Sequence, residues 1–185
     1  MSANTERQPN FGYSEVELRT LKSVYRSDLF EGKKIIVSGA GSGLGKAIAT
    51  LFARLGGDLI ICGRNEEKLS NAEDYFKSLG ASVFAHVLSI RDPEAVDAFM
   101  NDAWDAFGGV DVLINNAGIL LMKSLQETSL EEWNEIFRVN VTSIFLGTKL
   151  AFEPMRARKG GSIVNLSSIY GLVGAPTAAA YEASK

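Results

Sequence analysis

Tyr181 and Lys185, near the end of the 185-residue chain, have the types and spacing of a proton-donating pair. Side chains four residues apart on a helix lie on the same face. An ammonium group favours the ionised form of a neighbouring phenol, so such a pair can supply a proton near neutral pH. Two serines, Ser167 and Ser168, come shortly before the pair. These residue types suggest proton transfer to an oxygen atom of a substrate.

A glycine-rich turn is the second candidate site. The segment Ser38–Gly45 reads S-G-A-G-S-G-L-G and stands between a short apolar run and a helical pattern. Glycine is needed in a phosphate-binding turn because a Cβ atom would hold the main chain away from the ligand, and the helix behind the turn offers free N–H groups. The turn therefore predicts dinucleotide binding, with a packing turn as the alternative. The residues predicted to contact the dinucleotide are Gly39, Ser42, Gly43, Leu44 and Gly45.

The end of the second expected strand indicates which dinucleotide is favoured. An acidic residue there binds the ribose 2′-hydroxyl of NAD, whereas an arginine binds the 2′-phosphate of NADP. This chain has Gly63 at the acidic position, followed by Arg64. A guanidinium group can hold a phosphate through two parallel hydrogen bonds. NADP(H) is therefore favoured and NAD(H) remains possible. The alternative interpretation of Arg64 is a solvated surface residue.

Short apolar runs alternate with helical patterns along the chain. Strands are expected at 33–38, 58–62, 82–87, 110–115 and 162–167, and helices at 46–55, 66–79, 93–107, 130–152 and 178–185. The alternation predicts an α/β fold, a doubly wound parallel sheet with helices on both faces in three layers. Residues 33–185 form one predicted domain. Residues 1–32 form a predicted N-terminal extension, disordered over Met1–Asn10 and with a short amphipathic helix over Ser14–Tyr25.

Composition narrows the possible functions. The net charge of -3 gives no electrostatic argument for nucleic acid or an anionic membrane as a partner. With one cysteine, Cys62, and one histidine, His86, the chain offers no cluster of metal ligands. The single cysteine also fits a reducing compartment. Neither a membrane-spanning apolar run nor a signal peptide is expected. The protein is therefore expected to be cytoplasmic and free of metal.

Several separated motifs resemble those of one family, the short-chain dehydrogenase/reductases. Ser38–Gly45 is similar to the family's T-G-x-x-x-G-x-G turn, with serine in place of threonine. Asn115–Gly118 is similar to its N-N-A-G element, and Asn140 falls on its active-site asparagine. Ser168 lies 13 residues before Tyr181, which opens the Y-x-x-x-K pair. The resemblance covers residues 29–185 and implies a Rossmann-like fold. It also implies cofactor contacts from Asn116, Ala117, Gly118, Tyr181 and Lys185.

The same resemblance implies roles for the catalytic residues. Tyr181 would donate the proton in reduction, and Lys185 would support it and bind the nicotinamide ribose. Ser168 would orient the substrate oxygen, and Asn140 would anchor a water that links Lys185 to solvent. The cofactor carries the hydride. The implied function is an NADP(H)-dependent oxidoreductase acting on a secondary alcohol or ketone, such as a 3-oxoacyl compound, a steroid or a cyclic alcohol.

Two other functions stay open. A non-catalytic nucleotide-binding module would keep the glycine turn but would need no catalytic residues. A methyltransferase would need an acid at the end of the second strand, where this chain has Gly63 and Arg64. Members of the family usually form homodimers or homotetramers, which is the expectation for the full-length form.

The chain departs from the family at three places. Ser89 stands where the family often has an aspartate for the adenine amino group, and Ser42 stands where NADP-preferring members often have a basic residue. Members of the family are also longer, so the last strands and the substrate lid are expected to be missing. A carboxylate at Lys185 would then partly cancel the charge beside Tyr181. We therefore expect the 185-residue chain alone to be inactive.

Overall fold

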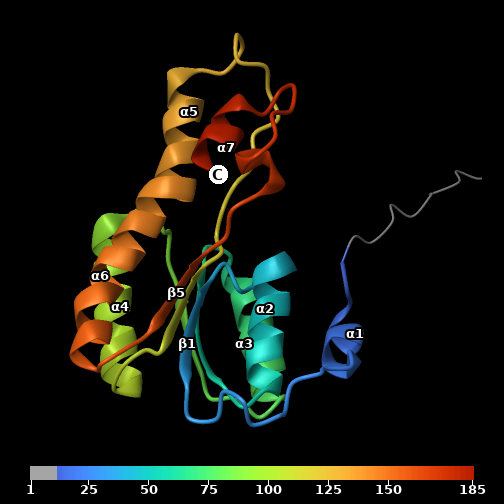
Figure 1. Cartoon of the computed structure of the whole chain (residues 1–185), viewed down its shortest axis with the longest axis vertical. Helices are drawn as coiled ribbons and strands as arrows, with labels where there is room; N and C mark the ends of the chain where they lie inside the picture. Colours follow the sequence, from blue (N-terminus) through green and yellow to red (C-terminus); the bar gives the residue numbers. More distant parts are fainter. Residues whose placement is uncertain (1–11) are drawn as a thin grey trace, which may run out of the picture.

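A computed structural model describes residues 12–185, which form one parallel five-stranded sheet with helices on both faces (Figure 1). The strands are β1 (Lys34–Ser38), β2 (Asp58–Gly63), β3 (Val83–Val87), β4 (Val112–Asn115) and β5 (Ser162–Asn165). Their order is β3-β2-β1-β4-β5, so the winding reverses between β1 and β4. The predicted doubly wound sheet is confirmed. The predicted disorder of Met1–Asn10 lies outside the described residues.

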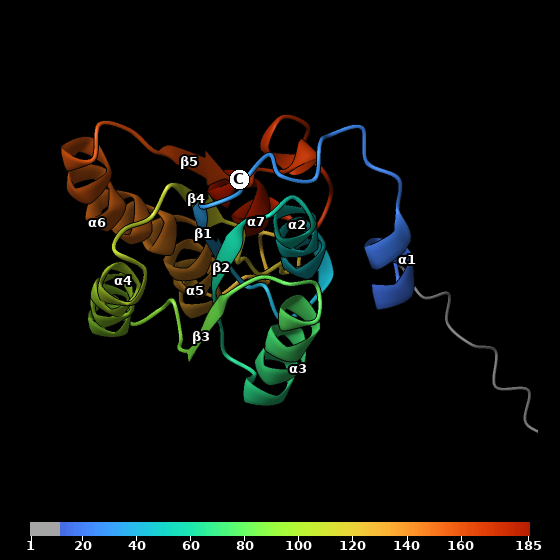
Figure 2. The same cartoon turned by 90° about the horizontal axis from the view of Figure 1, so that it is seen from below.

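The helices form two layers around the sheet (Figure 2). They are α1 (Glu15–Thr20), α2 (Gly43–Arg54), α3 (Glu66–Lys77), α4 (Pro93–Phe107), α5 (Leu130–Phe137), α6 (Ser143–Ala157) and α7 (Ala179–Ser184). α2 and α3 pack on one face, and α4 and α6 pack on the other. α5 and α7 lie together beyond the carboxyl edge of the sheet (Figure 1). Among the described residues, no helix is long and apolar enough to cross a membrane.

Alternate residues of each strand supply the two halves of the core. On β1, Ile35 and Val37 pack with α2 and α3, whereas Ile36 packs with α4 and α6. All three side chains are at most 1% exposed. Because helices cover both faces of the sheet, its strands are continuous apolar runs rather than alternating patterns.

The N-terminal helix is shorter than the predicted Ser14–Tyr25. α1 ends at Thr20, and Leu21 is already extended. One side chain of a neighbouring helix bonds to carbonyl groups at this end. Arg54 of α2 donates to the carbonyl oxygens of Leu18, at 2.9 Å, and of Leu21. These bonds replace a further helical turn, so the predicted end is wrong.

The long helix continues past its predicted end near Phe152. That prediction rests on Pro154, which disfavours a helical conformation in the residue before it. α6 instead runs to Ala157 with Pro154 inside it. Ala151 and Met155 are buried against the sheet, and this packing outweighs the hydrogen bond that proline removes.

Two boundaries near the carboxyl edge also differ from the prediction. α2 begins at Gly43 rather than Lys46, because the N–H of Lys46 already bonds to the Ser42 carbonyl at 3.2 Å. The glycines of the turn therefore form the first turn of the helix. β5 ends at Asn165, although the N–H of Leu166 still bonds to the Asn115 carbonyl at 3.1 Å.

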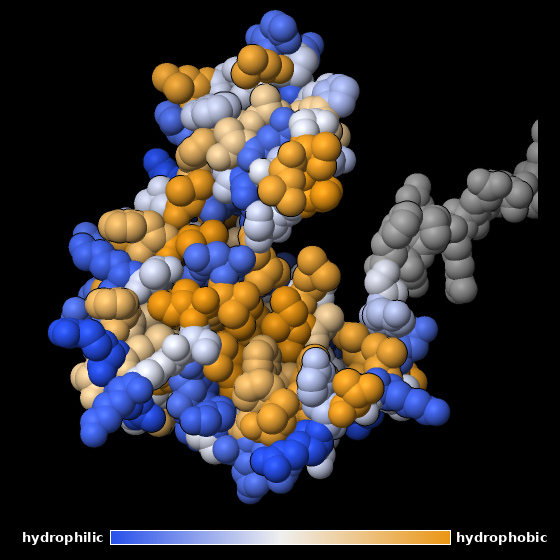
Figure 3. Space-filling model, in the orientation of Figure 1, coloured by the Kyte–Doolittle hydropathy of each residue, from blue (hydrophilic) through white to orange (hydrophobic). Residues whose placement is uncertain are grey.

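Apolar surface gathers over β5 and α2 on the face shown in Figure 3. Val164 of β5 and Leu51 of α2 are both partly exposed. β5 is the last strand on its side of the sheet, so its outer edge pairs with no strand of the described residues. An apolar strand edge of this kind can pair with a further strand.

Candidate active site

The glycine turn joins β1 to α2 at the carboxyl edge of the sheet. Gly39 and Gly43 have φ angles of 71° and 56°, which residues with a side chain rarely adopt. A Cβ atom on Gly45 would overlap the carbonyl oxygen of Gly39 and lie 2.5 Å from Nδ2 of Asn116. The turn therefore needs glycine for its own shape as well as for a ligand.

Ser38 connects this turn to the loop after β4. Its Oγ accepts hydrogen bonds from the main-chain N–H groups of Asn116, at 3.1 Å, and Ala117, at 3.0 Å. Nδ2 of Asn116 donates in return to the Ser38 carbonyl at 2.8 Å. Serine and threonine share the hydroxyl group that makes these bonds, so serine can replace the threonine of the family motif here.

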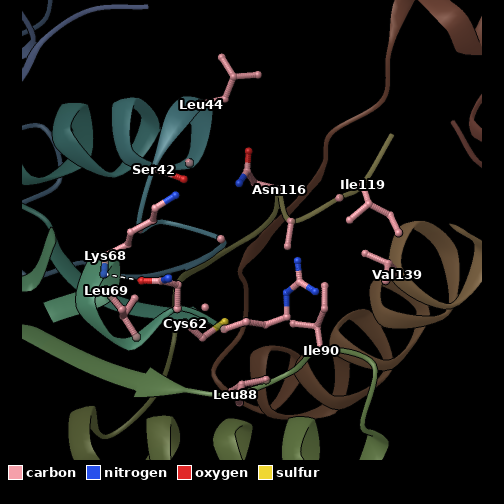
Figure 4. Close-up of a pocket in the computed structure, with 18 of the residues that line it drawn as sticks. Ser42, Leu44, Cys62, Lys68, Leu69, Leu88, Ile90, Asn116, Ile119 and Val139 are labelled. Carbon is pink, nitrogen blue, oxygen red and sulfur yellow. Dashed lines mark hydrogen bonds between the residues drawn. The ribbon is translucent and has the colours of Figure 1, made fainter. Parts of the chain in front are cut away.

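A cavity of about 670 Å³ opens between these loops (Figure 4). Its wall comes from the glycine turn, the end of β2, the loops after β3 and β4, and Val139. It lies where the strand order reverses, which is where open α/β sheets bind ligands. The predicted cofactor contacts that line it are Gly39, Ser42, Leu44, Gly45, Arg64, Asn116, Ala117 and Gly118. The other three, Gly43, Tyr181 and Lys185, do not line it.

The cavity wall is positively charged. Arg64, Lys68 and Arg91 line it, and no aspartate or glutamate of the described residues does. The side chain of Lys68 points toward Ser42 of the glycine turn (Figure 4). Arg91 forms an ion pair with Glu135 of α5, and its buried Nε has no acceptor in the part of the chain that the structure describes. A cavity with this charge and these glycines suits a ligand that carries phosphate groups.

Lys68 and Arg91 are missing from the sequence-based prediction. A local signal exists for Lys68: Asn65 caps α3, and its Oδ1 accepts from the N–H of Lys68 at 2.7 Å. This cap places Lys68 in the first turn of the helix that follows Arg64, on the cavity wall. No such signal exists for Arg91, because its position depends on the ion pair with Glu135 of a distant helix.

A π-helical segment, Arg138–Thr142, joins α5 to α6 and positions Asn140. The Asn140 side chain is 1% exposed. Its Oδ1 accepts from the N–H of Ile119, and its Nδ2 donates to the Ile119 carbonyl and to Oγ of Ser184, each at 2.9 Å. The amide therefore holds the long helix, the loop after β4 and α7 together. Single π turns inside helices are frequent at functional sites.

Replacing Asn140 by alanine should lower the free energy of unfolding by about 1–3 kcal/mol, because it leaves partly buried main-chain groups of Ile119 without partners. Urea denaturation followed by circular dichroism measures the change. Asn101→Ala is the matched control, since Asn101 is exposed on α4 and makes one long bond of 3.3 Å. That variant should stay within about 0.5 kcal/mol of the parent chain. Equal losses in the two variants would contradict the structural role of Asn140.

α7 brings Tyr181 and Lys185 beside the cavity wall. Nζ of Lys185 donates to the Leu166 carbonyl at 2.9 Å and lies 6.0 Å from the centre of the Tyr181 ring. A Cβ atom on Gly118, a residue of the wall, would lie 3.3 Å from this Nζ and 3.2 Å from Oδ1 of Asn140. Burial lowers the pKa of the Lys185 ammonium group, because the charged form loses hydration. Asn140 and Lys185 thus come together next to Gly118, and the Tyr181 ring lies beside Lys185.

Ser168 is connected to this group through Tyr170. Its Oγ accepts from the N–H of Tyr170 at 3.2 Å, and the Tyr170 ring meets the Tyr181 ring edge-on with centres 6.3 Å apart. Oγ of Ser167 donates to the Lys185 carbonyl at 2.8 Å, which holds this segment against α7. Between residues 12 and 185 the structure shows no hydrogen bond that joins the Ser168 and Tyr181 hydroxyl groups.

Comparisons with known proteins identify the family of this chain. The family model described as short chain dehydrogenase matches residues 33–185. The chain belongs to the short-chain dehydrogenase family. It is 44% identical over 157 residues to a cyclopentanol dehydrogenase of Comamonas testosteroni, which covers 83% of this chain and 61% of that protein.

Two further relatives of this short-chain dehydrogenase differ in cofactor. An NADP-dependent (R)-specific alcohol dehydrogenase of Lentilactobacillus kefiri is 40% identical, covering 86% of this chain and 63% of that protein. A short chain dehydrogenase/reductase of Burkholderia phymatum, solved in complex with NAD, has a TM-score of 0.81 at 33% identity. That match covers 84% of this chain and 56% of the solved one. This chain thus spans 61% to 63% of the length of the two curated relatives.

Proposed function

We propose that this short-chain dehydrogenase is an NADP(H)-dependent oxidoreductase that interconverts a secondary alcohol and its ketone. The observation that carries the proposal is the approach of Asn140 and Lys185 to Gly118, a residue on the wall of a positively charged cavity, with the Tyr181 ring beside Lys185. The relative from Comamonas is a cyclopentanol dehydrogenase, which supports a cyclic alcohol or ketone as substrate. A 3-oxoacyl compound and a steroid are the other proposed substrate classes.

The residues present fit the cofactor, which supplies the hydride when bound. Tyr181 gives its hydroxyl proton to the carbonyl oxygen of the substrate during reduction and recovers it during oxidation. The Lys185 ammonium group stabilises the phenolate that remains. The Ser168 hydroxyl accepts a bond from Tyr170 and keeps its own hydrogen free to donate to the same substrate oxygen.

Asn140 acts as a positioning residue in this proposal. Both hydrogens of its Nδ2 are used within the protein, so they hold Ile119 and Ser184 in place. Its Oδ1 accepts one bond and retains a second acceptor site. Because Oδ1 and the Lys185 Nζ approach the same side of Gly118, one water molecule can join them. This arrangement supports the proton relay that the family resemblance implies.

The preference for NADP(H) rests on charge at the end of β2. Gly63 offers no carboxylate for a ribose 2′-hydroxyl, and no acidic residue of the described chain lines the cavity. Arg64 and Lys68 offer two cations for a 2′-phosphate, and Arg64 can bind it through two hydrogen bonds. NAD(H) remains the second cofactor, supported by the relative from Burkholderia that was solved with NAD.

The experiment compares NADPH and NADH by fluorescence titration, and as reductants of cyclopentanone in a form of the protein that reduces a ketone. Arg64→Ala should raise the Kd of NADPH by about 10–50-fold, because hydrogen bonds between charged groups are lost. It should change the Kd of NADH by no more than about 2-fold. The matched control is Arg26→Ala, since the Arg26 side chain is 73% exposed and lies outside the cavity wall. A parent chain that prefers NADH would refute the NADP(H) proposal.

We also propose that the protein acts in the cytoplasm as a homodimer or homotetramer. Phe145 and Phe152 on α6 are each more than half exposed, which supports burial of this helix against a second copy. Cys62 is buried in the core, and burial raises the pKa of its thiol to about 12. A buried thiol of this kind is unreactive.

A further inference from the structure

The N-terminal helix α1 lies alongside α2 and outside the region that matches the family (Figures 1 and 2). Leu18 of α1 is buried, and polar contacts hold both ends of the helix. At one end, Glu15 forms an ion pair with Lys46 in the first turn of α2. At the other, Arg54 in the last turn of α2 donates to the carbonyl oxygens of Leu18 and Leu21. α1 is therefore attached to α2 at the first and the last turn of that helix.

The first turn of α2 is weak by itself. It contains Gly43 and Gly45, and glycine is among the poorest helix formers. The N-cap residue Ser42 makes no capping bond through its side chain. Gly45 cannot be replaced by a better helix former, because its position has no room for a Cβ atom. The turn that offers N–H groups to phosphates thus lacks the usual local stabilisation.

α1 contacts this turn through the ion pair between Glu15 and Lys46. The Lys46 side chain is 15% exposed and lies between the Glu15 carboxylate and the Tyr75 ring, with Nζ 5.0 Å from the ring centre. The N–H of Lys46 bonds to the Ser42 carbonyl at 3.2 Å, and its carbonyl accepts from Oγ1 of Thr50 at 2.7 Å. A fixed Lys46 therefore fixes the hydrogen bond that closes the first helical turn.

α1 also contacts α3, whose first turn lines the cavity beside the glycine turn. The Tyr75 hydroxyl donates to the Glu15 carbonyl at 3.2 Å, and Arg19 bonds to Oγ of Ser78. The N-terminal end of α3 carries Lys68, next to Arg64. One short helix thus joins the two helices whose starts form the phosphate side of the cavity.

We propose that α1 is a positioning element for cofactor binding, holding the first turn of α2 in the form that presents its N–H groups to a pyrophosphate. This inference rests on the proposed function, because it needs a cofactor with a pyrophosphate. The residues that act are Glu15 and Lys46, and neither lines the cavity. Their effect should therefore reach the ligand only through the geometry of residues 43–46.

The test uses the 185-residue chain with Glu15→Gln, and with residues 2–21 deleted. ADP and adenosine are the probes, titrated by calorimetry, because only ADP carries a pyrophosphate. Glu15→Gln should raise the Kd of ADP by about 3–5-fold and the deletion by about 10-fold. Adenosine affinity should change by less than about 2-fold. Amide hydrogen exchange at residues 43–46 should accelerate in both variants.

Asp105→Asn is the matched control, because Asp105 is an exposed acid on α4, across the sheet from α1. It should leave the Kd of ADP and the exchange at residues 43–46 unchanged. A lower melting temperature with unchanged ADP affinity and unchanged exchange would make α1 merely structural and overturn the inference. If the deleted chain fails to fold, the ADP affinity and the amide exchange of the Glu15→Gln variant test the inference alone. A parent chain that binds no ADP would instead overturn the proposed function itself.

Discussion

Replacing Tyr181 by phenylalanine should lower kcat for ketone reduction by about 10³-fold, because the variant lacks the only phenol proposed to protonate the substrate oxygen. NADPH affinity should stay within about 3-fold, since Tyr181 does not line the cavity among the described residues. Stopped assays with cyclopentanone measure kcat, and fluorescence titration measures the Kd. The assay uses the longest form of the protein that reduces a ketone, because this chain spans 61% of its relative from Comamonas.

Tyr170 supplies the matched control for this variant. Its ring contacts Tyr181 edge-on, so Tyr170→Phe removes a hydroxyl group from the same aromatic pair. That variant should keep kcat within about 3-fold. Equal losses in the two variants would point to packing rather than proton transfer. A parent protein that binds NADPH but turns over no ketone would favour the non-catalytic nucleotide-binding module.

Local signals in the sequence predict those elements that are stabilised locally. α4 begins and ends where the sequence predicts, at Pro93 and Phe107. Oδ1 of Asp92 caps its first turn, proline stands at its first position, and Gly108 ends it with a φ of 66°. Each of these residues acts within one turn of the helix, so the sequence alone contains the reason for both ends.

Elements that depend on distant contacts are predicted less well. The end of α1 depends on Arg54, which is 36 residues away from Leu18. The passage of α6 through Pro154 depends on the burial of Ala151 and Met155 against the sheet. Neither dependence is visible in a window of sequence, because the partner residues become neighbours only after folding.

The same distinction applies to the candidate site. Motif spacing predicts Asn140, Tyr181 and Lys185. The structure places Asn140 and Lys185 at Gly118 and the Tyr181 ring beside Lys185. Motif spacing also predicts Ser168, whose hydroxyl group caps a short turn rather than contacting Tyr181 in the described residues. The catalytic assignments themselves stay predictions. The motifs do not include Lys68 and Arg91, the two cations that line the cavity wall together with Arg64.

Gly45 is the position where the fold and the proposed cofactor site both require that no Cβ atom is present. A Cβ atom there would overlap the Gly39 carbonyl oxygen and lie 2.8 Å from the Gly39 carbonyl carbon. It would also lie 2.5 Å from Nδ2 of Asn116, which bonds to the Ser38 carbonyl. Two of these neighbours are main-chain atoms, so the turn itself would have to move.

Gly45→Ala should therefore lower the free energy of unfolding by about 3 kcal/mol and raise the Kd of NADPH by about 100-fold or more. Urea denaturation and fluorescence titration measure the two effects. Gly63→Ala is the matched control, since Gly63 lines the same cavity and its added Cβ would meet only Cδ1 of Leu69, at 3.8 Å. Its stability should be unchanged or higher by about 0.5 kcal/mol. A stable Gly45→Ala variant that still binds NADPH tightly would show that the turn can move without harm, contrary to the close packing seen here.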